Sequence, residues 1–230
     1  MGGKLENDVL AVGIKLYGQK KYEDALTFFL SLPPDSGADK MDAAYYLGLC
    51  YARLGRYDDA LLYLEQVVTS GGNIDRVMQC RFILAVIYAL SSRRRLADYE
   101  LSKLLETGYM TASVYAAIAY VAWEQSDIDK CLQYYEKSLE KDPQNMTSLN
   151  GLGYVLASED RDLARALTLC RQAVKVSPDS AACLDSLGWV YYKLGLFSDA
   201  MKCLEKAGKI DSSNEKIAEH IKIVSQAGRG

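Results

Sequence analysis

The sequence predicts an all-α solenoid built from repeated pairs of helices, and three observations support this prediction. Residues 44–64 and 184–204 match in the type and spacing of their apolar and small residues, at a constant offset of 140 residues. That offset equals about four repeats of 35 residues, a period typical of helical solenoids. Within 44–51, apolar or small residues recur with the three-four spacing of one helix face. The four prolines lie only where helices are expected to break: Pro33, Pro34, Pro143 and Pro178.

A small residue at position 8 of each repeat, with a second one twelve or thirteen residues later, sets the repeat boundaries. In the second repeat these residues are Gly48 and Ala60, and in the sixth they are Gly188 and Ala200. Small side chains there allow the two helices of a repeat to approach closely. The pattern predicts six repeats, at residues 6–39, 41–74, 78–111, 112–145, 146–180 and 181–214, preceded by an N-terminal extension over 1–5 that is compatible with a vector-derived remnant.

Each repeat is expected to fold as two helices joined by a tight turn, marked by Gly55 in the second repeat and Gly195 in the sixth. Such a unit leaves an apolar face open, so neighbouring units must stack. Residues 215–230 are expected to form a capping helix and tail, with an apolar stripe that covers the sixth repeat. Lys222 falls at position 8, where a close helix contact needs a small residue, so no second helix is expected after it.

The repeats resemble the tetratricopeptide repeat (TPR) family, whose pattern W-x2-L-G-x2-Y…A-x3-F…P extends over 34 residues. The sixth repeat matches this pattern at Leu184, Leu187, Gly188, Tyr191, Ala200 and, in place of Phe, Leu204. The fourth and fifth repeats carry the closing proline as Pro143 and Pro178. The resemblance covers about residues 6–214, and the style of the repeats is similar to that of bacterial members. It implies a right-handed α-solenoid that acts through a surface rather than through a catalytic pocket.

Charge and hydropathy argue against a nucleic-acid partner and against a membrane span. The formal net charge is −3 and the pI is near 5.4, whereas nucleic-acid binding depends on neutralising phosphates. The longest apolar run, residues 82–90, is far shorter than the about 20 residues that cross a bilayer. We therefore expect the partner to be another protein.

The six cysteines form no CxxC pair and mostly occupy apolar positions of the predicted helices. Buried, unpaired thiols suit a reducing compartment, so we expect a cytoplasmic protein, although the even number of cysteines leaves disulfides open. Residues 1–8 hold charges and no apolar core, so no signal peptide is visible. A periplasmic protein or a lipoprotein whose signal segment was removed stays open as an alternative.

The residues that carry catalysis are scarce in this chain. His220 is the only histidine, which excludes a multi-histidine metal site and argues against a histidine-based triad. We expect it to be a half-exposed residue of the capping helix. The glycine-rich phosphate-binding motifs are absent from the sequence. We expect no enzymatic activity, no cofactor and no metal.

By the TPR resemblance, the first helices of all repeats line a concave groove, with positions 2, 5, 9, 12 and 13 facing it. Position 9 carries aromatic residues in three successive repeats: Tyr120, Tyr154 and Trp189. The expected groove residues are Tyr45, Leu49, Phe82, Val86, Leu90, Tyr120, Trp123, Asn150, Tyr154, Asp185, Trp189 and Tyr192. Some family members use Lys at position 5 and Asn at position 9 to bind a chaperone's C-terminal carboxylate. Neither residue occurs there in any repeat of this chain, so we expect a more apolar ligand.

We expect the groove to hold a peptide or an amphipathic helix of a partner protein, with the chain acting as a scaffold or adaptor. Large aromatic residues are common anchors of interfaces, and Trp123, Tyr154, Trp189 and Tyr192 are the expected anchors. The run Arg93, Arg94 and Arg95 is a second candidate docking site, for an acidic partner. Two alternatives remain open at this point. The chain is a structural module that forms a homodimer through the groove or the first repeat, or it is a sensor of a small apolar ligand or a signalling peptide.

Overall fold

The computed structural model describes residues 6–33 and 35–228, and within these ranges it contains only α-helices and the turns that join them. The predicted all-α helical-repeat fold is therefore confirmed. The predicted extension over residues 1–5 lies outside the described residues. The chain divides into two compact units, which we call unit 1 (Met1–Tyr109) and unit 2 (Met110–Gly230).

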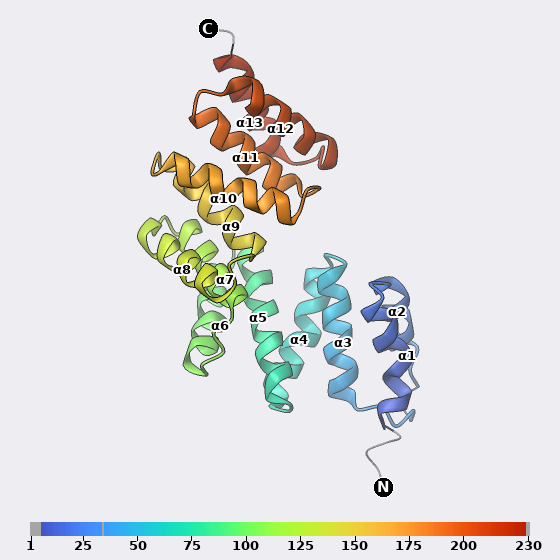
Figure 1. The fold of residues 1–230 in the computed structure, drawn as a ribbon. Coiled ribbons are helices and arrows are strands. Elements are labelled where there is room, and N and C mark those ends of the chain that lie inside the picture. The colour runs from blue at the N-terminus through green and yellow to red at the C-terminus, as the bar shows by residue number, and fades with distance from the viewer. Residues whose placement is uncertain (1–5, 34, 229–230) are drawn as a thin grey trace. The chain divides into compact units, whose positions relative to one another are not determined.

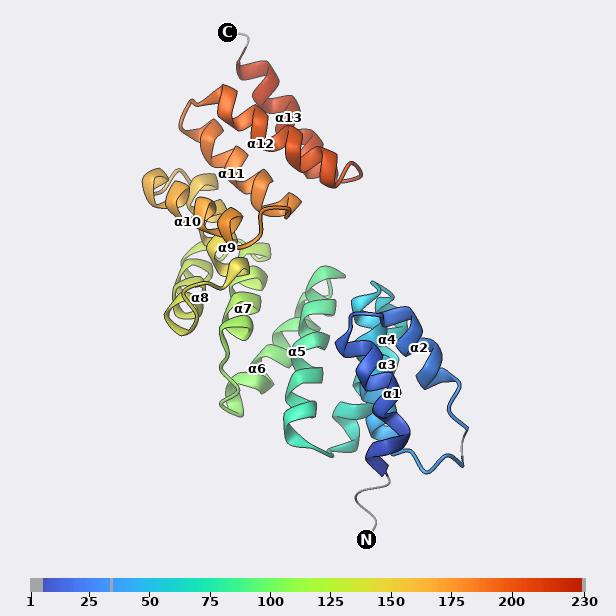
Figure 2. The same ribbon diagram turned by 45° about the vertical axis from the view of Figure 1, so that its right-hand side comes forward.

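Unit 1 consists of three antiparallel helix pairs (Figures 1 and 2). These helices are α1 (Glu6–Gly18), α2 (Tyr22–Leu30), α3 (Lys40–Arg53), α4 (Tyr57–Ser70), α5 (Ile74–Leu90) and α6 (Arg94–Glu106). The first helices of the pairs contact one another, α1 with α3 and α3 with α5. Their exposed sides therefore share one face of the unit.

Unit 2 consists of three further helix pairs and a final single helix. Its helices are α7 (Ala112–Glu124), α8 (Ile128–Lys141), α9 (Met146–Ser158), α10 (Leu163–Val176), α11 (Ala181–Lys193), α12 (Phe197–Ile210) and α13 (Glu215–Ala227). Here too the first helices contact one another in order, α7 with α9, α9 with α11, and α11 with α13. The last helix also packs on α12, where its buried residues Ile217 and Val224 face the neighbouring pair.

Small residues allow the helices of each pair to approach closely. A Cβ atom added at Gly48 would lie 2.7 Å from Leu64 Cδ2, and one added at Gly188 would lie 2.7 Å from Leu204 Cγ. Both leucines and the partner alanines Ala60 and Ala200 are fully buried. A larger side chain at either glycine would have to push the paired helix away.

Side-chain caps and glycine turns set where the helices begin and end. Asn73 accepts a hydrogen bond from the backbone N–H of Arg76, so α5 begins at Ile74, four residues before the predicted start of the third repeat. Gly55 and Gly195 have φ angles of 73° and 76° in the turns between paired helices. This left-handed conformation favours glycine, as the sequence pattern had indicated for both positions.

Candidate functional site

Unit 2 contains a cavity of about 440 Å³ on the face formed by the first helices α7, α9 and α11 and the start of α13. We call it the aromatic cavity. Its lining residues are Tyr120, Trp123, Glu124, Tyr135, Met146, Thr147, Asn150, Gly151, Tyr154, Val155, Ser180, Ala182, Asp185, Ser186, Asn214, Lys216 and Ile217. Its volume lies within the range of about 300–1,000 Å³ that is usual for ligand pockets.

The aromatic wall of this cavity is built around Tyr154. Trp123 of α7 meets the Tyr154 ring edge-on, with the ring centroids 6.1 Å apart. Lys216, at the start of α13, places its Nζ atom 4.4 Å from the centroid of the same ring. Both rings are half-buried, so each keeps surface available for contact with a ligand. The Tyr154 ring therefore has both an aromatic and a cationic neighbour, and each contact is favourable.

Asn150 places a polar group in this aromatic wall. It precedes Tyr154 by one helical turn, so both side chains emerge from the same face of α9. The Oδ1 atom of Asn150 is buried and has no hydrogen-bond partner among the described residues. A buried acceptor without a donor costs about 1–3 kcal/mol. Because this oxygen is buried, a ligand N–H group would reach it only after the Asn150 side chain turned toward the cavity, and would then recover that free energy.

Gly151 and Tyr135 form the floor of the aromatic cavity. Gly151 lies against the buried ring of Tyr135, and a Cβ atom at that position would overlap the ring. Burial raises the pKa of the Tyr135 hydroxyl far above its usual value, so the phenol stays protonated. The floor of the cavity at this point is therefore closely packed and uncharged.

Asp185 connects the cavity to the last helix. Its carboxylate accepts a hydrogen bond from Nδ1 of His220, across 2.8 Å, and both side chains are almost fully buried. The His220 ring stacks on Trp189, with the centroids 4.3 Å apart. The expectation of a half-exposed His220 was therefore wrong: α13 lies against α11, and the imidazole fills the space between Asp185 and Trp189. Among the described residues, Asp185 is its sole hydrogen-bond partner.

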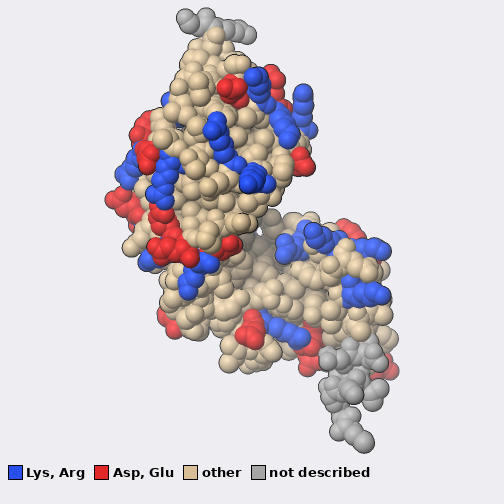
Figure 3. Space-filling model, viewed as in Figure 1, with Lys and Arg blue, Asp and Glu red and all other residues tan. Residues whose placement is uncertain are grey.

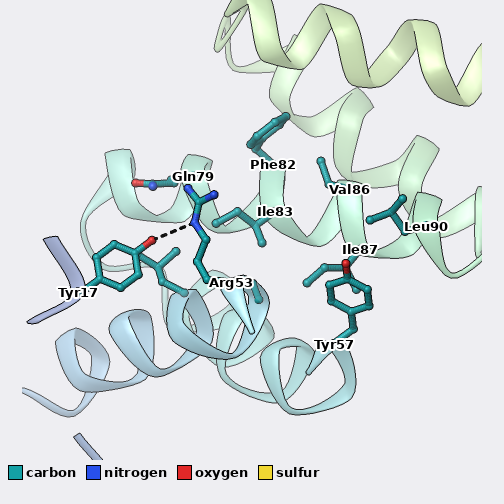
Figure 4. Close-up of a pocket in the computed structure, with 11 residues that line it drawn as sticks. Tyr17, Arg53, Tyr57, Gln79, Phe82, Ile83, Val86, Ile87 and Leu90 are labelled. Atoms are coloured by element: carbon teal, nitrogen blue, oxygen red, sulfur yellow. Dashed lines mark hydrogen bonds between the residues drawn. The ribbon is translucent and has the colours of Figure 1, made fainter. Parts of the chain in front are cut away.

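Unit 1 contains a smaller cavity, of about 220 Å³, on the face formed by α1, α3 and α5 (Figure 4). We call it the arginine pocket. Its lining residues are Tyr17, Leu49, Ala52, Arg53, Tyr57, Gln79, Phe82, Ile83, Val86, Ile87 and Leu90. This lining includes one cation and no carboxylate. Nε of Arg53 donates to the hydroxyl of Tyr17 across 3.5 Å, and this hydrogen bond raises the pKa of the guanidinium.

Family models identify the repeats directly. The tetratricopeptide repeat is matched three times, by residues 41–69, 116–182 and 180–207. The chain belongs to the TPR family.

The curated relatives that match this chain are much longer than it is. A TPR repeat-containing protein of Pseudomonas aeruginosa is 39% identical over 69 residues, which cover 30% of this chain and 12% of the relative. The human protein O-mannosyl-transferase TMTC1 is 23% identical over 188 residues, which cover 80% of this chain and 21% of the relative. The chain thus spans a small part of the length of each. The bacterial relative is compatible with the bacterial style of the repeats.

Solved structures of low sequence identity share the fold. A TPR protein from Parabacteroides merdae superposes with a TM-score of 0.71 at 16% identity, over 94% of this chain and 83% of the other. The Cut9–Hcn1 complex of the APC/C gives a TM-score of 0.78 at 16% identity, over 96% and 45%. YrrB, described as a TPR protein with an unusual peptide-binding site, gives 0.53 at 16% identity, over 78% and 91%.

The predicted groove residues of this TPR protein fall into three groups: those that line the aromatic cavity, those that line the arginine pocket and those that line neither. Tyr120, Trp123, Asn150, Tyr154 and Asp185 line the aromatic cavity, while Leu49, Phe82, Val86 and Leu90 line the arginine pocket. Three others lie in neither lining. Tyr45 is buried and donates a hydrogen bond to Gln79, Trp189 lies between Tyr192 and His220, and Tyr192 also contacts Phe197.

Arg53 and Lys216 line these two sites, and His220 is hydrogen-bonded to the cavity residue Asp185, but none of the three was among the predicted site residues. Lys216 and His220 fall at positions 2 and 6 of a seventh first helix, and position 2 faces the groove in the TPR family. Extending the repeat numbering into α13 would have found Lys216. Arg53 occupies position 13 of the second repeat, which belongs to the same face. The second predicted docking run, Arg93 to Arg95, is exposed, and Arg93 lies 3.7 Å from the carboxylate of Asp58.

The described residues include no cluster of His, Cys, Asp and Glu that could hold a metal ion, and no helix long and apolar enough to cross a membrane. All six cysteines are free thiols, and all but Cys203 are buried. Burial raises the pKa of Cys50 to about 11 and the pKa values of Cys80, Cys131 and Cys170 to about 12. These thiols behave as small apolar groups of the core.

Proposed function

We propose that the protein is a non-catalytic interaction scaffold that binds an extended peptide segment of a partner protein in the aromatic cavity. The observation that carries this proposal is the unpartnered Oδ1 atom of Asn150 beside the half-buried rings of Trp123 and Tyr154. The rings offer contact area to an apolar side chain, and the oxygen offers an acceptor to a backbone N–H group.

An extended segment suits this cavity better than a helix. In a helix, only the first four N–H groups lack an internal partner, so a docked helix brings no free backbone donor along its side. An extended peptide has a backbone N–H at every residue other than proline. The peptide-binding site described for YrrB shows that this fold type can bind peptides, and it supports the proposal in that limited sense.

The chemistry around His220 supports a non-catalytic role. An imidazole activates a nucleophile when it reaches a hydroxyl or a thiol through a hydrogen bond. Within the described residues, the hydrogen bonding of His220 ends at Asp185, and one face of its ring is covered by Trp189. The pair therefore joins α13 to α11 and presents no nucleophile to the cavity.

The proposal is tested by identifying a partner and mapping its bound segment. The full chain is cross-linked in a lysate of its source organism, the attached peptide is sequenced, and the corresponding synthetic peptide is labelled with a fluorophore. Fluorescence anisotropy then measures its Kd for each variant. We expect Trp123→Ala to weaken binding about 30-fold, because loss of an interface anchor costs about 2 kcal/mol.

Two further variants make the result specific. Asn150→Leu, which keeps the size but removes the acceptor, should weaken binding about fivefold, since one hydrogen bond is worth about 1 kcal/mol. Tyr99→Ala removes a half-exposed tyrosine on α6, in the other unit, and serves as the matched control. If Trp123→Ala binds the peptide as tightly as the wild type does, with equal helicity by circular dichroism, the aromatic cavity is not the binding site.

A further inference from the structure

The turns that join paired helices carry opposite charges in the two units. In unit 1 the turn residues 19–21, 54–56 and 91–93 contain lysine and arginine but no acid. In unit 2 the turn residues 125–127 and 159–162 contain four acids and one arginine, and the third turn, residues 194–196, is uncharged. Figure 3 shows Lys and Arg side chains gathered over the end of unit 1 where these turns lie. We call this end the basic turn edge; its cations are Lys20, Lys21, Arg53, Arg56, Arg93 and Arg95.

Contacts between neighbouring helix pairs place these cations along one edge. Arg53, at the end of α3, donates to Tyr17 near the end of α1. Arg93, at the start of α6, lies 3.7 Å from Asp58 in the first turn of α4. Arg56 is paired with Asp59, 3.0 Å away. Among the described residues, by contrast, Arg53 has no carboxylate partner, and its one hydrogen bond goes to a neutral phenol.

The arginine pocket opens beside this edge. Phe82 and Val86 of α5 are half-buried, and Leu90 exposes 54% of its surface. Figure 4 shows that Arg53 points toward the same space as Ile83 and Phe82. A guanidinium without an acid, set against an apolar wall, complements a ligand with an apolar side chain close to a carboxylate.

We propose that the arginine pocket and the basic turn edge together bind an acidic, apolar segment of a partner protein. An apolar side chain of that segment enters the pocket between α3 and α5, against Phe82 and Val86. A neighbouring Asp or Glu forms a bidentate pair with Arg53, and further acids meet the cations of the turns. The proposal rests on the proposed role of the chain as a protein-binding scaffold, but it uses a different unit and different residues.

The test starts from a display library of random twelve-residue peptides. The library is selected in parallel on the full-length wild type, on Arg53→Gln and on Trp123→Ala. We expect wild type and Trp123→Ala to enrich a class of peptides that Arg53→Gln does not enrich. In that class, Asp or Glu should lie within three residues of Leu, Ile or Phe.

The most enriched peptide of this class is then synthesised with a fluorophore for anisotropy measurements. Arg53→Gln should weaken its binding at least tenfold, and Arg53→Lys should recover part of the loss because it keeps the charge without the planar fork. Lys40→Gln removes an exposed cation from the opposite end of α3 and should change Kd less than twofold. Raising NaCl from 50 to 500 mM should weaken the wild-type complex, because exposed charges are screened.

Several outcomes would overturn the proposal. Enriched peptides without acids, or equal binding by Arg53→Gln and the wild type, would remove the role of Arg53. If sedimentation shows a wild-type dimer that Phe82→Ala converts to a monomer, the pocket is occupied by a second copy of this chain. If only peptides that depend on Trp123 are enriched, the proposed function stands and this second site does not exist. If no peptide is enriched at all, both proposals fail.

Discussion

The two units carry different kinds of side chain at equivalent positions of their repeats. At positions 5 and 9, unit 1 has Phe82 and Val86 in its arginine pocket. Unit 2 has Asn150 and Tyr154 at those positions in its aromatic cavity. The helices of the two units pair in the same way, so the backbone does not explain the difference. The side chains on the first helices determine what each face can bind, while the small residues and leucines between paired helices maintain the fold.

The polar groups of the two units are also buried to different degrees. In unit 2, Asp185 and His220 are almost fully enclosed, and Ser138 and Ser148 form a buried hydrogen bond 2.6 Å long. In unit 1, the ion pair of Arg81 and Glu100 is 2.7 Å long, with 19% and 11% of the two side chains exposed. Polar groups deep in a protein are costly when they lose a partner, so unit 2 should be the more sensitive to their removal.

The largest effect is expected where the two units are alike. Gly48→Leu in unit 1 and Gly188→Leu in unit 2 each force a side chain against a buried leucine of the paired helix. We expect each to lower the free energy of unfolding by about 3 kcal/mol or more, because neither helix pair has room to adjust. Urea unfolding followed by circular dichroism measures the loss. Gly18→Ala is the control, because a Cβ atom there meets nothing within 4 Å; an unchanged unfolding midpoint for Gly188→Leu would contradict the close helix contact.

The second largest loss of stability is expected to differ between the two units. His220→Ala leaves the buried Asp185 carboxylate without its donor and removes the ring that stacks on Trp189. We expect a loss of about 3 kcal/mol in the free energy of unfolding. Arg81→Met in unit 1 should cost less, because water reaches part of that ion pair.

A double-mutant cycle tests the reason for this difference. The double variant Asp185→Ala/His220→Ala should be clearly more stable than the sum of the two single losses predicts. Simple additivity of the two variants would show that the pair is not coupled, and that the cost of His220→Ala comes from lost packing alone.

The smallest effect concerns the thiols, which are free in both units. At pH 8, a thiol reagent such as DTNB should react first with Cys203, the one cysteine that is not fully buried. Because burial raises the pKa of Cys80, Cys131 and Cys170 to about 12, their thiolates form far more readily in the unfolded chain. Stability should therefore be unaffected by these groups below about pH 8.5, and should begin to fall as the pH rises above that value toward the folded pKa values. Rapid labelling of all six thiols at pH 8, or of Cys203→Ser at the wild-type rate, would contradict this assignment.

The helical fold could be predicted from the sequence because its signals are local. The three-four spacing of apolar residues, the small residues at paired positions and the glycine turns each depend on residues within one repeat. The repeat pattern alone does not show where α5 begins, because Asn73 caps a helix whose first turn precedes residue 78, where the pattern of the third repeat starts. That helix is correspondingly the longest of those described, at 17 residues.

The candidate sites could be predicted only in part, because they depend on contacts between repeats. Trp123, Asn150 and Tyr154 occupy repeat positions that the TPR resemblance places in the groove, and all three line one cavity. The same positions could not show that Trp189 would be covered by His220, because that contact requires α13 to pack on α11. The repeat position of Arg53 also does not show that its guanidinium has no carboxylate partner among the described residues. That depends on which side chains the neighbouring helices place near it.

The last helix has a consequence for how the protein is made. Lys216 of α13 lies against Tyr154, and His220 of the same helix holds Asp185 at the edge of the cavity. The first three helix pairs of unit 2 contain most of the cavity wall, but α13 completes it. During translation, those pairs can fold while the aromatic cavity is still incomplete. The ability to bind a partner there would thus arise only after residues 215–227, the last helix of the unit, have left the ribosome.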